Sequence, residues 1–137
     1  RNKMLVGQGI DIVSVKRIEK LLKKYNKRFI ERIFSHSEIK ELEFNRHDKE
    51  INFLKFSNRF AAKEAASKAL GTGMSSGVKF KDIEIFNQKN GKPFIKFKGS
   101  AKKVYRKLSR EGKKVNAYLS MSNENEFAIA IVSISLE

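Results

Sequence analysis

The stretch NRFAAKEAASKALGTG, residues Asn58–Gly73, carries the strongest helix pattern in this 137-residue chain. Its middle is rich in alanine, which favours helices and adds so little bulk that another backbone can come close. Gly71 follows this run and supplies the left-handed residue that commonly ends a helix. The pattern predicts a long central helix that begins near Ile51 and ends near Leu70.

The charged residues of this helix allow two interpretations. Glu64 and Lys68 are four residues apart, and Arg59 and Lys63 form a neighbouring cationic row. One interpretation is a solvent-facing ion pair worth ~0.2–0.5 kcal/mol. The other is a phosphate-binding helix, on which the cations hold anionic oxygens and Glu64 holds a divalent metal between them. Spacing alone does not choose between the two.

The alternating segment Met4–Val13 predicts a β-strand near the start of the chain. Asp11 shares one face of this strand with Gly7 and Gly9, where the missing side chains leave room for another element. Asp11 is then either a hydrogen-bond acceptor at the end of a strand or a metal ligand near a substrate.

Two of these segments resemble one enzyme family, the AcpS-type 4′-phosphopantetheinyl transferases, or holo-acyl-carrier-protein synthases. The helix signature of that family reads approximately R-F-A-A-K-E-A-x-x-K-A-x-G-T-G, and Arg59–Gly73 matches it at each defined position. The run Gly9–Ile12 is similar to the family's opening G-x-D-I motif. The resemblance implies a single α+β domain over residues 1–137, in which an antiparallel sheet packs against a long central helix.

The resemblance also implies roles for particular residues. Asp11 and Glu64 would bind Mg²⁺, and Glu64 and Lys68 would be catalytic, with Lys68 stabilising charge that grows on phosphoryl oxygens. The general base stays open between Glu64 and a metal-bound water. The expected contacts to coenzyme A are Arg59, Lys63, Lys68, Gly71, Thr72, Gly73, Pro93 and Asn123. A homotrimer with sites between its subunits is expected, and it would let Pro93 and Asn123 reach a neighbouring site.

One position departs from the family pattern. Members often have S-x-S-H where this chain has Ser120-Met121-Ser122-Asn123. Asparagine cannot act as a general base, although it can hydrogen-bond a phosphate or a ribose. Asn123 therefore supports one alternative function, a carrier-protein-binding homologue without catalysis.

Cations gather on the helix that is predicted after Ser14. A solvated basic face is the common reason for such a pattern, and a dock for an acidic helix is the alternative. The resemblance implies that Arg17 binds acyl carrier protein, an acidic partner. Extending the same face along the helix adds Lys20, Lys24 and Arg28 to this expected surface.

The net charge of +15, from 30 Lys and Arg against 15 Asp and Glu, favours polyanionic partners. A basic nucleic-acid-binding module is the generic interpretation of such a charge and is kept as a second alternative. Acidic proteins and phosphate-rich substrates satisfy the same charge, and the resemblance argues against nucleic acid.

The amino-acid composition also bears on membrane association and on the cellular setting. No apolar run approaches the ~20 residues that cross a bilayer, so no membrane association is expected. The absence of cysteine suits a cytoplasmic setting. Residues 1–3 precede Met4, and the sequence leaves open whether they are native.

The rest of the chain alternates turn signals with short periodic segments. Ser37 is expected to cap a helix that continues to about Asn45, although the capping-box pattern is found at Ser35 and Glu38 and not at Ser37 and Lys40. The last strand is expected at the centre of the sheet because it is almost continuously apolar. The further predictions are strands at 80–86, 93–97, 115–121 and 126–136 and a helix at 100–111.

Overall fold

The structure is a computed structural model that describes residues 3–44, 52–75 and 77–137. Its elements mix helices with antiparallel strands, which confirms the predicted α+β class. In chain order they are β1 (Met4–Ser14), α1 (Val15–Tyr25), α2 (Lys27–Ile33), α3 (His36–Phe44), α4 (Phe53–Ala69), the 3-10 turn η1 (Phe80–Asp82), β2 (Ile83–Asn87), β3 (Pro93–Phe97), α5 (Gly99–Lys107), β4 (Val115–Glu124) and β5 (Phe127–Leu136).

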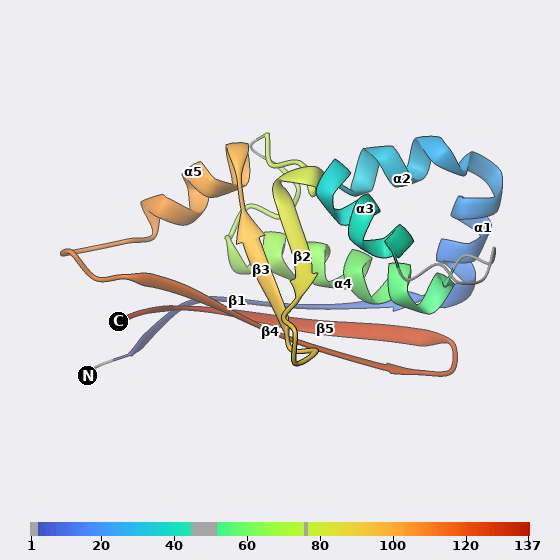
Figure 1. The fold of residues 1–137 in the computed structure, drawn as a ribbon. Coiled ribbons are helices and arrows are strands. Elements are labelled where there is room, and N and C mark those ends of the chain that lie inside the picture. Colours follow the sequence, from blue (N-terminus) through green and yellow to red (C-terminus); the bar gives the residue numbers. More distant parts are fainter. Residues whose placement is uncertain (1–2, 45–51, 76) are drawn as a thin grey trace.

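Three long strands form the main sheet in the order β1-β5-β4, with both pairings antiparallel. The apolar β5 is the central strand, as predicted. Helix α4 lies along one face of this sheet, and β2 and β3 form a separate hairpin on the same side (Figure 1). Helices α1 to α3 gather near one end of α4, and α5 lies near the other end (Figure 1).

Small residues set the distance between α4 and the sheet. Five alanines of α4 are buried: Ala61, Ala62, Ala65, Ala66 and Ala69. On the strand side, a Cβ atom added to Gly9 would lie 2.0 Å from the carbonyl oxygen of Ala65. One added to Gly7 would lie 2.1 Å from the carbonyl oxygen of Ala69. Backbone therefore packs directly on backbone here, as the glycines and alanines predicted.

The ends of α4 follow from local chemistry. The side chain of Asn52 accepts a hydrogen bond from the N–H of Lys55 at 3.0 Å and caps the first turn. Gly71 has φ 87°, and its N–H donates to the carbonyl of Lys68 at 3.0 Å. Gly71 therefore ends the helix as predicted, while the predicted start at Ile51 lies outside the described residues.

Two predictions about the helices before α4 are wrong. The predicted basic face runs through Arg28, but α1 ends at Tyr25 and Arg28 belongs to α2. The break is at Asn26, whose φ of 44° takes the backbone out of the helical region. Ser35, rather than Ser37, caps α3. Its hydroxyl accepts from the N–H of Glu38 at 3.2 Å, and the Glu38 carboxylate accepts from the N–H of Ser35 at 3.0 Å, which is a capping box.

Smaller differences concern where elements begin and end. The first part of the predicted 80–86 strand is η1, and the strand itself is β2. Helix α5 ends at Lys107, so the predicted helical residues that follow it are outside the helix. The predicted end of α3 at Asn45 lies outside the described residues. No helix in the described part of the chain is long and apolar enough to span a membrane.

Candidate active site

The packing of β1 on α4 brings a carboxylate and an ammonium group together. The Nζ atom of Lys68 donates to Oδ1 of Asp11 at 3.2 Å and to the carbonyl of Ile10 at 3.0 Å. Asp11 comes from the face of β1 that carries Gly9, and Lys68 from the last turn of α4. Lys68 therefore reaches across to the strand, and among the described residues its ion-pair partner is Asp11 and not Glu64, which was one of the two interpretations of the helix.

Glu64 lies one helical turn before Lys68 and is half-buried. Its pKa is raised, first by burial and then by the negative charge of Asp11, while the positive charges of Lys68 and Arg17 act to lower it. The charges of Asp11, Lys68 and Arg17 thus all act on Glu64, and these four residues are called the cluster below. The structure thus brings together Asp11, Glu64 and Lys68, as the sequence predicted for the site.

Arg17 is a member of this cluster that the sequence analysis assigned only to partner binding. It lies in the first turn of α1, and its N–H donates to the hydroxyl of Ser14, which caps that helix, at 3.4 Å. The sequence does indicate that Arg17 lies near Asp11. A helix that starts directly after a strand keeps its first turn beside the last strand residues, and Arg17 follows Asp11 by six positions.

The cluster suits a hard divalent cation such as Mg²⁺. Asp11 and Glu64 offer oxygen ligands from separate elements, and Mg²⁺ commonly takes one or two protein carboxylates together with phosphate oxygens and water. The carboxylate of Glu64 accepts no hydrogen bond from the described residues. Burial and then the negative charge of Asp11 raise the pKa of Glu64, and a bound cation would offset both effects.

Arg59 and Lys63 do not belong to this cluster, so the predicted grouping of both cations around Glu64 is wrong. They lie on a face of α4 that turns toward α3 and β2. The Nζ atom of Lys63 donates to Oε1 of Glu38 at 2.6 Å, to the carbonyl of Phe80 at 2.9 Å and to the carbonyl of Ile83 at 2.5 Å. An ammonium group has three donors, and all three are used inside the protein. This contradicts the predicted contact of Lys63 with coenzyme A.

Arg59 is also buried, with 4% of its surface exposed. Burial lowers the pKa of its guanidinium group, while the nearby carboxylates of Glu41 and Glu38 act to raise it. Its Nη2 atom is buried and has no hydrogen-bond partner among the described residues. An anion contact by Arg59 is thus chemically reasonable and remains a prediction.

The glycine-rich loop after α4 uses part of its hydrogen-bonding capacity on the helix. The N–H of Gly73 donates to the carbonyl of Ser67 at 3.0 Å, and the N–H of Gly71 is bonded to Lys68. The hydroxyl of Thr72 donates to the carbonyl of Gly73 at 2.8 Å. The N–H groups of both glycines therefore already donate hydrogen bonds within the protein. Contacts of this loop with coenzyme A remain predictions.

Asn123 and Pro93 are not in contact with the cluster within one chain. The register pairs Asp11 with Ala130 on β5 and Asn123 with Ala128, so Asp11 and Asn123 are two strands apart. This separation is roughly 10 Å between strand axes. Pro93 begins β3 in the separate two-stranded sheet.

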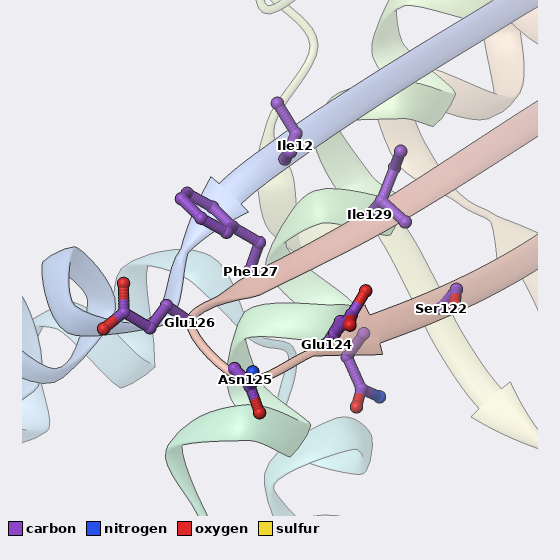
Figure 2. Close-up of a pocket in the computed structure, with 8 residues that line it drawn as sticks. Ile12, Ser122, Glu124, Asn125, Glu126, Phe127 and Ile129 are labelled. Carbon is purple, nitrogen blue, oxygen red and sulfur yellow. The ribbon is translucent and has the colours of Figure 1, made fainter.

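A hollow lies on the sheet around the β4–β5 turn. Figure 2 shows Ile12 and Ile129 projecting from the strands together with Phe127 near this turn. Ser122, Asn123, Glu124, Asn125 and Glu126 complete the lining. Asn123 thus lines this hollow, whereas Asp11 and Glu64 are not among its lining residues.

Comparisons with known proteins agree with this arrangement. A sequence model of the 4′-phosphopantetheinyl transferase superfamily matches residues 7–132. The holo-[acyl-carrier-protein] synthase of Buchnera aphidicola is 41% identical over 130 residues, covering 93% of this chain and 95% of that protein. The crystal structure of the enzyme of that name from Neisseria meningitidis superimposes with a TM-score of 0.79 at 38% identity, covering 96% of this chain and 98% of that one. The Helicobacter pylori enzyme, solved in complex with coenzyme A, has a TM-score of 0.75 at 34% identity and covers 93% of this chain and 98% of its own.

These matches span nearly the whole chain and include both elements that build the cluster. The chain belongs to the holo-[acyl-carrier-protein] synthase family of the 4′-phosphopantetheinyl transferase superfamily. It is therefore an enzyme, of the phosphopantetheinyl transferase class.

Proposed function

We propose that the enzyme transfers the 4′-phosphopantetheine arm of coenzyme A to a serine hydroxyl of apo-acyl carrier protein in a Mg²⁺-dependent reaction. The serine oxygen forms a bond to the β-phosphorus, and the bond to the leaving adenosine 3′,5′-bisphosphate breaks. The proton of the serine hydroxyl passes to a base. The observation that carries this proposal is the cluster of Asp11, Glu64, Lys68 and Arg17 at the contact of β1 with α4.

Asp11 and Glu64 are proposed to hold the metal ion. They come from different elements, and Gly9 fixes the distance between these elements by letting the backbones touch. When bound, Mg²⁺ supplies positive charge that neutralises the pyrophosphate of coenzyme A. The proximity of both carboxylates to each other supports this assignment, because a cation reduces the repulsion that raises the pKa of Glu64.

Lys68 is proposed to stabilise charge on the phosphoryl oxygens. Half of its side chain, 51%, is exposed, so its ammonium group can reach a substrate while remaining bonded to Asp11. A positioned cation of this kind contributes by matching the charge that develops in the transition state. Arg17 adds a second positive charge at the same cluster.

The base is proposed to be Glu64 or a water molecule that the site orders. A raised pKa brings a glutamate closer to the operating pH, which is the direction that improves a general base. Asn123 cannot serve as a base, and it is proposed only as a hydrogen-bond partner of coenzyme A from a neighbouring subunit. Pro93, Arg59 and the Gly71–Gly73 loop are proposed as further contacts to coenzyme A.

The exposed cations of α1 are proposed to bind acyl carrier protein. Arg17, Lys20 and Lys24 are exposed, and Arg17 extends this surface to the cluster. A carrier protein docked on α1 would therefore bring its serine to Asp11 and Glu64. Arg28 lies in α2 beyond the break at Asn26 and is a weaker part of this proposed surface.

A homotrimer is proposed because one face of the sheet is apolar and exposed. Ile10, Ile12, Phe127 and Ile131 have 55%, 62%, 50% and 38% of their surfaces exposed. Burial of this face between subunits would remove apolar surface from water and would cover the hollow near Asn123 (Figure 2). A cytoplasmic setting and a role in fatty acid biosynthesis complete the proposal.

Intact-mass analysis of apo-acyl carrier protein tests the proposed reaction. The carrier protein is incubated with the enzyme, coenzyme A and Mg²⁺, with a parallel sample that contains EDTA. We expect a mass gain of one phosphopantetheine arm that is absent with EDTA. No gain with several carrier proteins would favour a non-catalytic homologue.

A salt titration separates the remaining alternative, a nucleic-acid-binding module. Binding to nucleic acid would weaken steeply with salt in proportion to the number of phosphates contacted. It would also be independent of Asp11 and Glu64, whereas the proposed phosphopantetheine transfer should depend on both.

A further inference from the structure

A buried polar network lies beside the cluster, on another face of α4. Its members are Ser35, Glu38, Lys63 and Glu84, whose exposed fractions are all below 5%. They come from α3, its N-cap, α4 and β2. Figure 1 shows that α3 and β2 both lie next to α4. The network joins three elements inside the protein.

Glu38 is the centre of this network. Its Oε1 atom accepts from the N–H of Ser35 and from Lys63, and its Oε2 atom accepts from the N–H of Ile85 on β2 at 3.1 Å. The same carboxylate therefore completes the cap of α3, holds a strand and neutralises the buried ammonium of Lys63.

Lys63 fixes α4 to the segment around η1 as well. Its two bonds to carbonyls go to Phe80, the first residue of η1, and to Ile83, which directly follows η1. The other charged groups that influence Lys63 are Glu84 and Lys98, and these two pair with each other at 3.3 Å. Lys63 has no donor left for a substrate, so any part that it takes in catalysis must be indirect.

Lys63 and Glu64 are consecutive residues, so their side chains point about 100° apart around the axis of α4. A helix whose Lys63 is tied to α3 and β2 has Glu64 turned toward β1. On the β1 side, contact at Gly9 sets the distance between the helix and the strand, whereas the bonds of Lys63 hold the helix from the side of α3 and β2.

We infer that Glu38 and Lys63 are positioning residues, which set the rotation of α4 and thereby hold the carboxylate of Glu64 beside Asp11. This inference rests on the proposed function of that carboxylate pair. A buried ion pair is weak evidence for stability, since replacing both partners by uncharged groups is often neutral or stabilising. The inferred role of the pair next to Glu64 is therefore geometric, and it does not depend on a net gain in stability.

The test uses a double variant, Glu38→Gln with Lys63→Met. It removes both buried charges together and keeps an amide oxygen that can accept from the N–H groups of Ser35 or Ile85. Glu84→Gln is the matched control, because Glu84 is an equally buried carboxylate of the network that bonds to Ser35 and Lys98 but not to Lys63.

Three quantities are measured for each protein: the thermal unfolding midpoint, kcat and KM for transfer, and the Mn²⁺ dissociation constant by electron paramagnetic resonance in the presence of coenzyme A. We expect the double variant to fold, to lose about tenfold or more in kcat and to bind Mn²⁺ more weakly, because small misplacements of reacting groups are costly. The KM of the double variant for the carrier protein should stay close to that of the unmodified enzyme. All three quantities of the Glu84→Gln control should also stay close to the unmodified values.

A folded double variant with unchanged kcat and unchanged Mn²⁺ affinity would overturn the inference. Failure of the double variant to fold, next to a folded Glu84→Gln control, would also overturn it in favour of a role in folding alone. If the unmodified enzyme itself shows no transfer, the proposed function fails, and the Mn²⁺ comparison still decides whether the pair positions Glu64.

Discussion

At the scale of single residues, the carboxylate of Glu64 is subject to opposing influences. Burial and the charge of Asp11 raise its pKa, whereas the charges of Lys68 and Arg17 act in the other direction. The net effect is an acid that takes up a proton at a higher pH than an ordinary glutamate. The proposed cation binding by Glu64 should therefore weaken as the pH falls through this raised pKa.

Protonation of Glu64 should weaken the proposed cation binding, but it has the opposite effect on folding, which it favours. A raised pKa means that the folded protein binds this proton more readily than the unfolded chain does, so protonation of Glu64 removes a penalty from the folded state. Acid conditions should thus impair the site through Glu64, although protonation of Glu64 itself favours the folded state.

The pKa of Glu64 provides the first prediction. In the metal-free protein, Asp11→Asn should lower this pKa because it removes a neighbouring negative charge, and Lys68→Met should raise it because it removes a positive one. Carboxyl ¹³C shifts of labelled glutamate, followed by NMR during a pH titration, measure both changes. An unchanged pKa in both variants would show that the three side chains do not form one cluster.

At the scale of elements, the contact of β1 with α4 determines the site. Asp11 and Lys68 meet because the strand and the helix touch through their backbones at Gly7 and Gly9. A wider spacing would move the carboxylate of Asp11 away from α4, so the glycines have a functional role as well as a packing role.

Gly9→Ala tests this contact. The added methyl group would overlap the carbonyl oxygen of Ala65, so we expect a loss of about 1–3 kcal/mol in the free energy of unfolding, together with reduced transfer activity. Urea unfolding and the initial rate measure the two effects. Gln8→Ala, at the adjacent exposed position, is the control and should change neither by much. Equal stability of the two variants would contradict the close packing.

Much of this contact was predictable from the sequence. The alanines of α4 and the glycines of β1 predicted a close approach, and the face shared by Gly9 and Asp11 placed the carboxylate at it. The orientation of Arg59 and Lys63 was not predictable in the same way. Helical spacing shows which residues share a face, but which face turns toward β1 depends on packing against α3 and β2, far away in the sequence.

Other local features were missed for particular reasons. The break at Asn26 depends on a single left-handed residue, and the basic pattern continues through it without interruption. The cap at Ser35 was readable from the capping box of Ser35 and Glu38, although Ser37 competes with it in the sequence. The link between Glu38 and Lys63 could not be read from the sequence because it joins residues 25 positions apart.

The basic face of α1 provides a prediction for carrier-protein binding. Reversing Lys20 and Lys24 to glutamate should raise KM for the carrier protein and weaken its salt dependence, because both residues act through exposed charge. KM for coenzyme A should stay unchanged. The same reversal of Lys102 and Lys103 on α5 changes the net charge equally at the other end of the molecule and is the control (Figure 1). Equal effects of the two reversals would contradict a specific dock on α1.

At the scale of the whole molecule, the sheet separates two surfaces with different properties. One face carries α4 and the cluster, and the other exposes isoleucines and the hollow beside the β4–β5 turn (Figure 2). Subunit assembly on the exposed face would allow Asn123, which lies two strands from Asp11 in its own chain, to make its proposed contact with coenzyme A in a neighbouring site.

Ile12→Asp tests this assembly. Ile12 has 62% of its surface exposed, so the change is tolerable in a single subunit but would place a charge in a buried interface. Sedimentation analysis should show a trimer for the unmodified enzyme and a smaller species with reduced activity for Ile12→Asp. Tyr25→Asp, at an exposed position of α1, should remain trimeric. A fully active monomer of the unmodified enzyme would contradict the proposal.

The most direct measurement is the Mg²⁺ dependence of transfer by Asp11→Asn and Glu64→Gln, with Glu31→Gln as an exposed carboxylate control on α2. Initial rates are obtained from the mass gain of apo-acyl carrier protein across a Mg²⁺ titration. Since a bound metal ion is worth several kcal/mol in such reactions, each site variant should lose about 100-fold or more, and the control should match the unmodified enzyme. Full Mg²⁺-dependent rates in both site variants would show that Asp11 and Glu64 do not form the metal site.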